Sequence, residues 1–262
     1  MYSQEYEIQL SIIIPCYNEA DVLLSLSEVL SLFLDNVVGE NIWQFVFVSN
    51  GCTDNTQNVL SKIYDQWPNT SNVFLDKPNY GFALRKGLEK AEGKWALIIN
   101  VDFWDKNFIS WAWGKRQAYD LILGSKLGNP FLDKRPKYRK FLSFVLNFIL
   151  QAYFGGVVSD THGQKLLYLP KIRPILKTCV MNRGQFDTEF TLKCQRKGLK
   201  LAEAPVPIEE SRKQKNLMLK KILQNLIDIY RLNKILKNIP QTDNLFYHRY
   251  SIQDLKNIEN IK

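Results

Sequence analysis

The sequence predicts an α/β fold with a doubly wound, mostly parallel sheet flanked by helices. Short apolar runs rich in β-branched and aromatic residues alternate with segments of helical periodicity over residues 10–124, and this alternation is typical of parallel sheets with crossover helices. Amide and acidic side chains follow the apolar run at residues 95–100. Ligands of open α/β sheets bind beyond the carboxyl ends of the strands, so this stretch indicates an enzyme that handles an activated phosphate ester.

Each expected element has its own local signal. Strands are short apolar runs bounded by polar turns, and helices repeat apolar residues at helical spacing. The predicted order is strand 10–15, helix 19–34, strand 43–48, helix 56–66, strand 73–75, helix 81–91, strand 95–100 and strand 119–124. Asp54 is placed to cap the helix at 56–66, and residues 186–190 open a further helix.

Two later segments are basic and amphipathic. A basic run at residues 134–140 leads into an apolar segment at 141–158, which is nearly long enough to span a bilayer. Polar residues recur in it every four positions, which favours a membrane-surface or core helix over a transmembrane one. Residues 211–239 fit equally a helix packed on the sheet or in a homodimer and a helix docked on a membrane. We therefore expect a domain at 1–208 and a C-terminal helical extension at 209–262.

Composition narrows the class of protein. Hydrophobic residues make up 45% of the 262 residues, and the formal net charge is +9. That surplus suits phosphate-rich ligands, anionic membranes or nucleic acid, but the sequence has no motif of the known nucleic-acid-binding modules. Four cysteines without C-x-x-C spacing and two histidines argue against a zinc site and for reduced thiols in a cytoplasmic protein. The first ten residues lack an apolar secretory signal.

Several segments, taken in order, resemble family-two glycosyltransferases of the GT-A fold, and the dolichyl- or polyprenyl-phosphate sugar transferase branch is the most similar. These segments read S-I-I-I-P-C-Y-N-E-A at 11–20, V-F-V-S-N-G-C-T-D-N-T at 46–56, the stretch 79–105, D-L-I-L-G-S-K at 120–126, S-D-T-H-G-Q-K at 159–165 and F-D-T-E-F at 186–190. Each motif is weak alone, and their order makes the match specific.

The resemblance implies a nucleotide-sugar-dependent glycosyltransferase that works with inversion. Its donor would be UDP- or GDP-linked, its acceptor a lipid phosphate or a glycan, and its cofactor a divalent cation, Mg²⁺ or Mn²⁺. Such an enzyme would serve polysaccharide or glycolipid biosynthesis, in the cytoplasm or peripherally at the inner face of the membrane.

Nine residues are candidates for donor binding. An aromatic face can stack on a base, and a carboxylate can accept hydrogen bonds from ribose hydroxyls. The candidates are Pro15, Tyr17, Asn18, Glu19, Asn50, Gly51, Arg85, Asn100 and Asp102. The alternative for the segment at 15–19 is a turn that ends a strand and caps a helix.

Two family signatures are altered in this chain. Residues 49–54 read S-N-G-C-T-D where the family has D-D-G-S-x-D, and the D-x-D motif reads Asn100-Val101-Asp102. Asp102 and Asn100 are the expected metal ligands, with Asp105 as a substitute, and one carboxylate with diphosphate oxygens can hold Mg²⁺ weakly. The alternative is a catalytically weakened or inactive relative that only binds nucleotide sugars.

Phosphate and acceptor contacts are expected farther along the chain. Basic and hydroxyl side chains stabilise phosphate oxygens, and the candidates are Ser125, Lys126, Arg135, Arg139, Lys165 and Arg212. Asp187 and Glu189 are the candidate catalytic acids, one of which would serve as base for a sugar hydroxyl. His162 is either a proton shuttle or a structural loop residue. Residues 201–208 resemble the edge strand of the family.

Overall fold

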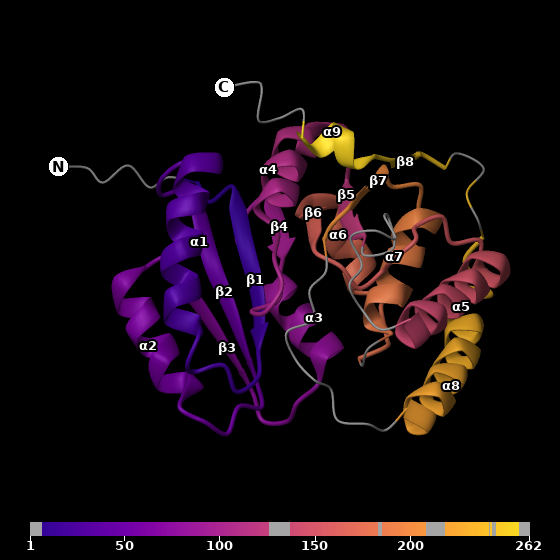
Figure 1. Cartoon of the computed structure of the whole chain (residues 1–262), viewed down its shortest axis with the longest axis horizontal. Helices are drawn as coiled ribbons and strands as arrows, with labels where there is room; N and C mark the ends of the chain where they lie inside the picture. The colour runs from indigo at the N-terminus through magenta and orange to yellow at the C-terminus, as the bar shows by residue number, and fades with distance from the viewer. Residues whose placement is uncertain are drawn as a thin grey trace.

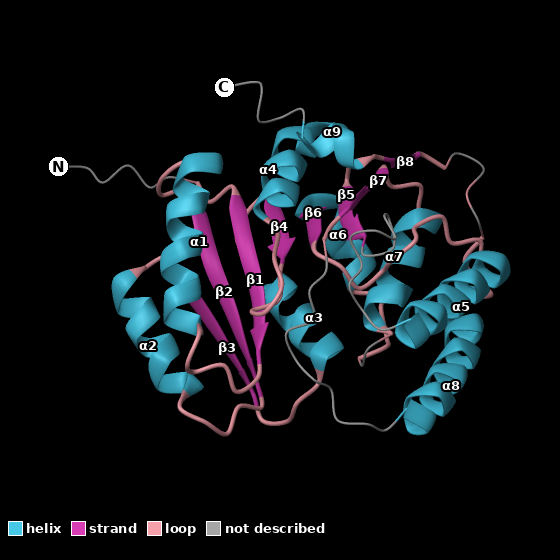
Figure 2. Ribbon diagram, in the orientation of Figure 1, coloured by secondary structure: helices cyan, strands magenta, loops and turns pink. Residues whose placement is uncertain are grey.

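A mixed sheet of eight strands forms the centre of the described protein (Figure 2). The computed structural model describes residues 7–125, 137–182, 185–207, 218–240, 242 and 245–256. The strands are β1 (Leu10–Cys16), β2 (Trp43–Asn50), β3 (Ser71–Leu75), β4 (Trp95–Ile98), β5 (Leu121–Ser125), β6 (Lys165–Tyr168), β7 (Leu201–Pro205) and β8 (Tyr247–Arg249). Their order across the sheet is β3-β2-β1-β4-β6-β5-β7-β8.

The predicted α/β class and mostly parallel sheet are confirmed. Strand β6 is antiparallel to both of its neighbours, β4 and β5, whereas the other strand pairs of the described sheet are parallel. Because β1 lies between β2 and β4, the carboxyl ends of these three strands meet at one edge of the sheet. That edge is where ligands bind in open α/β sheets.

Helices cover both faces of the sheet. The helices are α1 (Leu23–Val37), α2 (Thr56–Gln66), α3 (Tyr80–Lys90), α4 (Lys106–Lys115), α5 (Lys137–Phe154), α6 (Leu169–Leu176), α7 (Phe186–Arg196), α8 (Met218–Leu236) and α9 (Ile252–Lys256). Alternate strand residues face opposite layers: Ile12 and Ile14 pack with α1, α2 and α4, whereas Ile13 packs with α3, α6 and α7.

The C-terminal part of the chain corrects one sequence-based expectation. Strand β8 pairs in parallel with β7, so β7, which was expected as the edge strand, does not form the edge of the described sheet. Helix α9 then reaches the apolar layer around α4 through Leu255, and Tyr250, which lies between β8 and α9, packs against the same layer. Residues beyond 208 therefore include a strand of the main sheet as well as helices. The division at residue 208 stays a prediction.

Several elements of the structure were not predicted from the sequence. Helix α4, strand β6, helix α6, strand β8 and helix α9 have no counterpart among the predicted elements. Strand β6 has four residues and β8 three, which is too short for a periodic pattern. Helix α4 begins where the Asp105 carboxylate accepts a hydrogen bond from the Phe108 N–H at 2.7 Å.

Helices α5 and α8 lie side by side at the end of the molecule opposite α2 (Figure 1). Leu150 and Phe154 of α5 are buried against Leu232 and Leu236 of α8. Arg196 of α7 donates hydrogen bonds to the main-chain oxygens where both helices end, those of Phe154, Leu236 and Ile239. In the described part of the chain, no helix has the length and apolar content needed to cross a bilayer.

Candidate active site

The turns after β1 and β2 are bound to each other. Asn18 adopts a positive φ of 56°, and its side-chain oxygen accepts a hydrogen bond from the Thr53 N–H at 2.8 Å. The main-chain N–H of Glu19 donates to the Thr56 hydroxyl at 3.0 Å. Gly51 has φ +72°, and a Cβ there would lie 2.7 Å from the nitrogen of Pro78. The predicted tight turn at Gly51 therefore requires glycine.

Asp54 joins the same two turns. Its carboxylate accepts hydrogen bonds from the N–H groups of Thr56 at 3.0 Å and Ala20 at 3.3 Å. Burial raises the pKa of Asp54, but these hydrogen bonds outweigh it, so the pKa lies below its usual value. Helix α2 starts beside Asp54 as predicted, although Asn55 occupies the N-cap position. Tyr17, half-exposed in this loop, is available to stack on a base.

Asn50 and Asn100 are connected through the start of α3. The Asn50 side-chain oxygen accepts a hydrogen bond from the Asn79 N–H at 2.7 Å. The next residue, Tyr80, donates its hydroxyl to the Asn100 side-chain oxygen at 3.1 Å. Together with the cap that Asn79 forms on Phe82, these bonds bring the ends of β2 and β4 to one helix terminus.

Two acids act on Tyr80 electrostatically. Burial raises the pKa of Tyr80, and the negative charges of Asp187 and, to a lesser degree, Asp102 raise it further. The predicted catalytic acid and the predicted metal-side acid, 85 residues apart in sequence, thus influence the same tyrosine.

Asp187 forms a buried ion pair with Lys165. The Lys165 ammonium lies 2.8 Å from Asp187 Oδ1, and the two side chains are 0% and 1% exposed. Lys165 also donates to the Gly163 main-chain oxygen at 3.0 Å. The predicted contact of Lys165 with a phosphate is thus replaced by a contact with the candidate base. Within the described residues, Asp187 Oδ2 has no hydrogen-bond donor.

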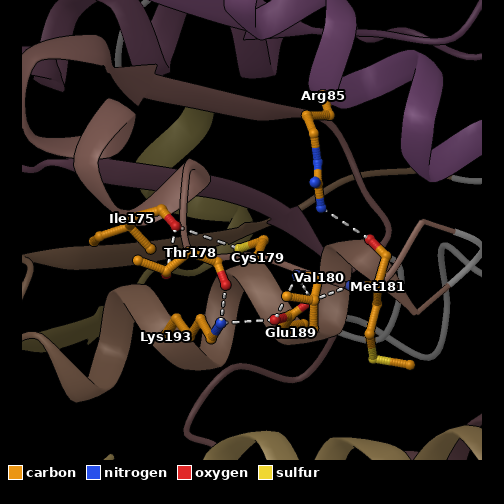
Figure 3. Close-up of polar contacts among 8 residues, drawn as sticks. All are labelled: Arg85, Ile175, Thr178, Cys179, Val180, Met181, Glu189 and Lys193. Atoms are coloured by element: carbon orange, nitrogen blue, oxygen red, sulfur yellow. Dashed lines mark hydrogen bonds and ion pairs between the residues drawn. The ribbon is translucent and has the colours of Figure 1, made fainter.

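Glu189 has a structural environment (Figure 3). Its carboxylate accepts hydrogen bonds from the N–H groups of Val180, at 3.0 Å, and Met181, at 2.7 Å. It also pairs with the Lys193 ammonium at 2.7 Å. Because it is fully buried and holds a loop at both oxygens, Glu189 fixes the residues before α7. Asp187 remains the candidate base.

Arg85 is directed at the same loop (Figure 3). Its guanidinium donates to the Met181 main-chain oxygen at 3.3 Å and lies 5.6 Å from the centre of the Phe186 ring. The Phe82 N–H of α3 donates to the Asn182 oxygen at 2.9 Å. These contacts connect α3 to the loop before α7. Arg85 therefore has a structural role, and its role in donor binding stays a prediction.

Ser125 belongs to a buried polar cluster at the end of β5. Its hydroxyl lies 2.6 Å from that of Ser159, and Ser159 is bound by the Glu203 carboxylate through both its N–H, at 2.7 Å, and its hydroxyl. Tyr247 of β8 donates to Glu203 at 2.9 Å, and Arg249 lies 3.8 Å from it. Ser125 is fully buried, and its hydroxyl forms a hydrogen bond with a neighbouring protein group, the Ser159 hydroxyl.

The expected metal site offers one carboxylate and one amide oxygen. Asp102 is exposed, and Asn100 holds a bond from Tyr80 on its side-chain oxygen. Asp105 caps α4, so it does not stand ready as the substitute ligand. In the described ranges, no group of three or more His, Cys, Asp or Glu side chains is placed to hold a metal ion. This set fits a hard cation held largely by diphosphate oxygens.

The remaining predicted residues divide into two groups. Lys126, Arg135 and Arg212 lie outside the described residues, as does the side chain of Arg139, whose backbone belongs to α5. His162 is described: its main-chain N–H donates to Asp160 at 2.9 Å, and its Nδ1 lies 3.1 Å from the Thr161 hydroxyl. Pro15 pairs with Val48 inside the sheet.

A cavity of about 660 Å³ opens beside Asn79. One wall is the loop before α7, with Val180 and Met181, and the other is α8. Helix α8 contributes the basic side chains of Arg231 and Lys234, the acidic Asp228, which lies 3.7 Å from Arg231, and apolar side chains. The cavity therefore combines a small surplus of positive charge with apolar surface next to the residue that binds Asn50.

The family assignment follows from comparison with known proteins. Residues 11–167, more than half of the chain, match the model of the family described as "Glycosyl transferase family 2". The chain belongs to glycosyl transferase family 2. The family predicted from the motifs is therefore confirmed.

Several curated relatives are named as dolichyl-phosphate beta-glucosyltransferases. The chain is 26% identical over 216 residues to a dolichyl-phosphate beta-glucosyltransferase of Dictyostelium discoideum, covering 76% of this chain and 66% of that protein. It is 26% identical over 235 residues to the dolichyl-phosphate beta-glucosyltransferase of Saccharomyces cerevisiae, covering 80% and 69%. The chain spans about two thirds of the length of these relatives.

Solved structures share the fold. Glucosyl-3-phosphoglycerate synthase from Mycobacterium tuberculosis, in complex with Mn²⁺, UDP and glucosyl-3-phosphoglycerate, aligns with a TM-score of 0.62 at 14% identity over 90% of this chain and 81% of that one. TarS of S. aureus in complex with UDP aligns with a TM-score of 0.59 at 15% identity over 90% and 68%. The predicted GT-A type of α/β fold is thus supported by structures of nucleotide-bound enzymes.

Three site residues were missing from the sequence-based set. Tyr80 follows the α3 cap, and the Asn-Tyr-Gly sequence at a predicted helix start was the available signal. Glu203 and Tyr247 carried no such signal, because their contact joins β7 to a three-residue strand 44 positions later.

Proposed function

We propose that this chain transfers glucose from UDP-glucose to a lipid phosphate, with inversion at the anomeric carbon. The observation that carries the proposal is the junction at Tyr80, whose hydroxyl donates to Asn100 on the donor side and whose pKa is raised by burial and by the charges of Asp187 and Asp102. A glycosyltransferase needs its donor and acceptor groups within reach of one reacting carbon. The junction at Tyr80 supports such an arrangement.

UDP is the favoured donor nucleotide. Two structural relatives were solved with UDP, and another structure of the first of them holds UDP-glucose with Mn²⁺. The curated relatives are named as glucosyltransferases. In this chain, half-exposed Tyr17 and the Asn50 side chain lie at the ends of neighbouring strands, where they would contact the base and the ribose.

The acceptor side favours an anionic, partly apolar molecule. The cavity beside Asn79 is lined by Arg231 and Lys234 as well as Val180 and Ile227. A lipid phosphate matches both features, because its headgroup is anionic and its chain is apolar. A phosphate oxygen is largely ionised near neutral pH, so transfer to it requires no strong base.

The reaction breaks the bond between the anomeric carbon and the diphosphate and forms one to the acceptor oxygen on the opposite face of the sugar. Asp187, held by Lys165, orients the acceptor or receives its proton if one remains. The loop at 179–182, fixed by Glu189 and Arg85, keeps this side of the site rigid. Asp102 and Asn100 would hold a divalent cation, which supplies positive charge to the departing diphosphate when bound.

The proposal is tested by incubating the protein with UDP-glucose, Mn²⁺ and a short-chain polyprenyl phosphate. We expect a glucosylated lipid phosphate and released UDP, and we expect Asp102→Ala and Asp187→Asn each to reduce turnover by at least about 100-fold. Glucose transfer to glycan acceptors alone would overturn the lipid-phosphate assignment. Tight binding of UDP-glucose with no transfer to any acceptor would make the chain a non-catalytic binder.

The acceptor cavity is tested separately. Arg231→Gln with Lys234→Gln is expected to raise the KM for the lipid phosphate by about 30-fold, since two charges at roughly 1 kcal/mol each make about 2 kcal/mol. The KM for UDP-glucose should not change. Lys62→Gln with Lys90→Gln, which removes two exposed charges elsewhere, serves as the matched control. Equal effects of both pairs on the acceptor KM would remove the cavity from the proposal.

A further inference from the structure

Helix α5 exposes a row of phenylalanines. Phe141, Phe144 and Phe148 are 65%, 64% and 61% exposed, and the rings of Phe144 and Phe148 stack with centroids 6.5 Å apart. Positions three, four and seven apart share one face of a helix. Large apolar side chains that gather on one surface mark an interaction site. We call these three residues the aromatic face of α5.

The aromatic face is turned away from the protein core. Leu150 and Phe154, which anchor α5 to α7 and α8, are buried, and helical geometry places them on the opposite side of α5 from the three phenylalanines. Arg196 binds the last turn of α5 through the Phe154 oxygen. The helix is thus fixed to the body by one side and presents its aromatic side outward.

The two helices at this end of the molecule are rich in basic residues. Helices α5 and α8, which lie side by side (Figure 1), together contain seven basic residues and one acidic residue. The acid, Asp228, is buried and hydrogen-bonded to Gln224. These two helices therefore carry a surplus of six positive charges in a chain whose formal total is +9.

We propose that the aromatic face of α5 docks the protein on an anionic lipid bilayer. Phenylalanine rings on a helix that lies in the membrane interface insert among the acyl chains, and nearby lysines and arginines attract anionic headgroups. A second copy of this chain is a poorer occupant, because a symmetric contact would bring two like-charged surfaces together. The bilayer supplies both the apolar layer and the opposite charge.

Docking would place α8 and its cavity at the membrane, because α8 packs directly on α5. The inference deepens the proposed function by naming the surface through which a lipid-borne acceptor is reached. The docking itself is independent of catalysis. Loss of vesicle binding and loss of sugar transfer are therefore separate results.

The experiment measures sedimentation of the full chain with vesicles, using pure phosphatidylcholine and phosphatidylcholine with about 30% phosphatidylglycerol. We expect binding to the anionic vesicles and a reduction of at least about tenfold for the triple variant Phe141→Ser, Phe144→Ser and Phe148→Ser, since three apolar rings are lost. The matched control replaces three exposed apolar residues on α1, α2 and β3, at the other end of the molecule (Figure 1): Leu32→Ser, Tyr64→Ser and Phe74→Ser. The control should bind as the unaltered protein does.

A second variant guards against misfolding. Phe141→Leu, Phe144→Leu and Phe148→Leu keep apolar side chains on the face, so this protein should retain most of the binding that the serine variant loses. The proposal is overturned if the unaltered protein ignores anionic vesicles, or if the serine triple variant binds them as well as the control. It is also overturned if the serine substitutions only dissociate a dimer detected by sedimentation velocity.

Discussion

Lys165 and Asp187 form an ion pair that is closed to solvent, with 2.8 Å between the ammonium and Oδ1. Lys165 begins β6, the antiparallel strand at the centre of the sheet, and Asp187 lies in the first turn of α7. The pair thus joins the sheet to the helix that carries the candidate base. The charge of Asp187 also raises the pKa of Tyr80, whose hydroxyl binds Asn100 on the donor side of the site.

Replacing one partner of this ion pair should lower the free energy of unfolding more than replacing both. Lys165→Met leaves a buried carboxylate without its counterion, which we expect to lower the free energy of unfolding by about 3–5 kcal/mol. Lys165→Met combined with Asp187→Asn should recover a large part of that loss. Urea denaturation of the single and double variants measures both values. A double variant as unstable as the single one would contradict the pairing.

The two acids of the first turn of α7 should behave differently. Glu189→Gln weakens the hydrogen bonds to Val180 and Met181 and the pair with Lys193, so we expect a loss of about 2–4 kcal/mol in the free energy of unfolding. Asp187→Asn leaves the buried Lys165 ammonium without its counterion and should lose a similar amount of stability, but it should also abolish transfer at temperatures where the protein is folded. Thermal unfolding and turnover are measured on both variants. Equal loss of turnover in the two folded variants would contradict the division of roles.

Metal affinity should respond to Asn100. Asn100→Asp restores a second carboxylate, and because hard cations prefer charged oxygens we expect the Mn²⁺ concentration for half-maximal activity to fall by about tenfold. Tyr80→Phe, which removes the bond to Asn100 without adding charge, is the control and should not lower that concentration. Calorimetric titration of Mn²⁺ in the presence of UDP checks the same ranking. Weaker Mn²⁺ binding by Asn100→Asp would remove this residue from the metal site.

Strand β8 should act on the site through Glu203. Tyr247→Phe deletes a hydroxyl that binds Glu203, and we expect kcat to fall several-fold with little change in KM, because Glu203 positions Ser159 and Ser125. Tyr250→Phe deletes a hydroxyl of the same segment that binds Tyr119 instead. Both variants should lose about 1 kcal/mol of stability. Similar kcat values in the two variants would mean that β8 stabilises the fold and does not affect turnover through Glu203.

The turn held by Asp54 should weaken in acid. Because the folded-state pKa of Asp54 lies below the usual value of 3.8, its stabilising contribution is present above that value and is lost as the pH falls through the folded-state pKa. Asp54→Asn should therefore reduce the difference in melting temperature between pH 6 and pH 3. The melting temperature measured across that interval decides the matter.

The sequence by itself determined the alternation of strands and helices and the placement of polar residues at strand ends, because these are local patterns of side-chain spacing. It thereby identified Asn50, Asn100 and Asp102 as neighbours at one edge of a sheet. The tertiary structure alone decided that Glu189 is engaged by a loop and by Lys193, which leaves Asp187 as the candidate base. Their surroundings come from Lys165 and from the loop at 179–181, and contacts between separate elements leave no periodic signal in the chain. The same reason hid the link from Tyr247 to Glu203, which exists only because a three-residue strand closes the sheet.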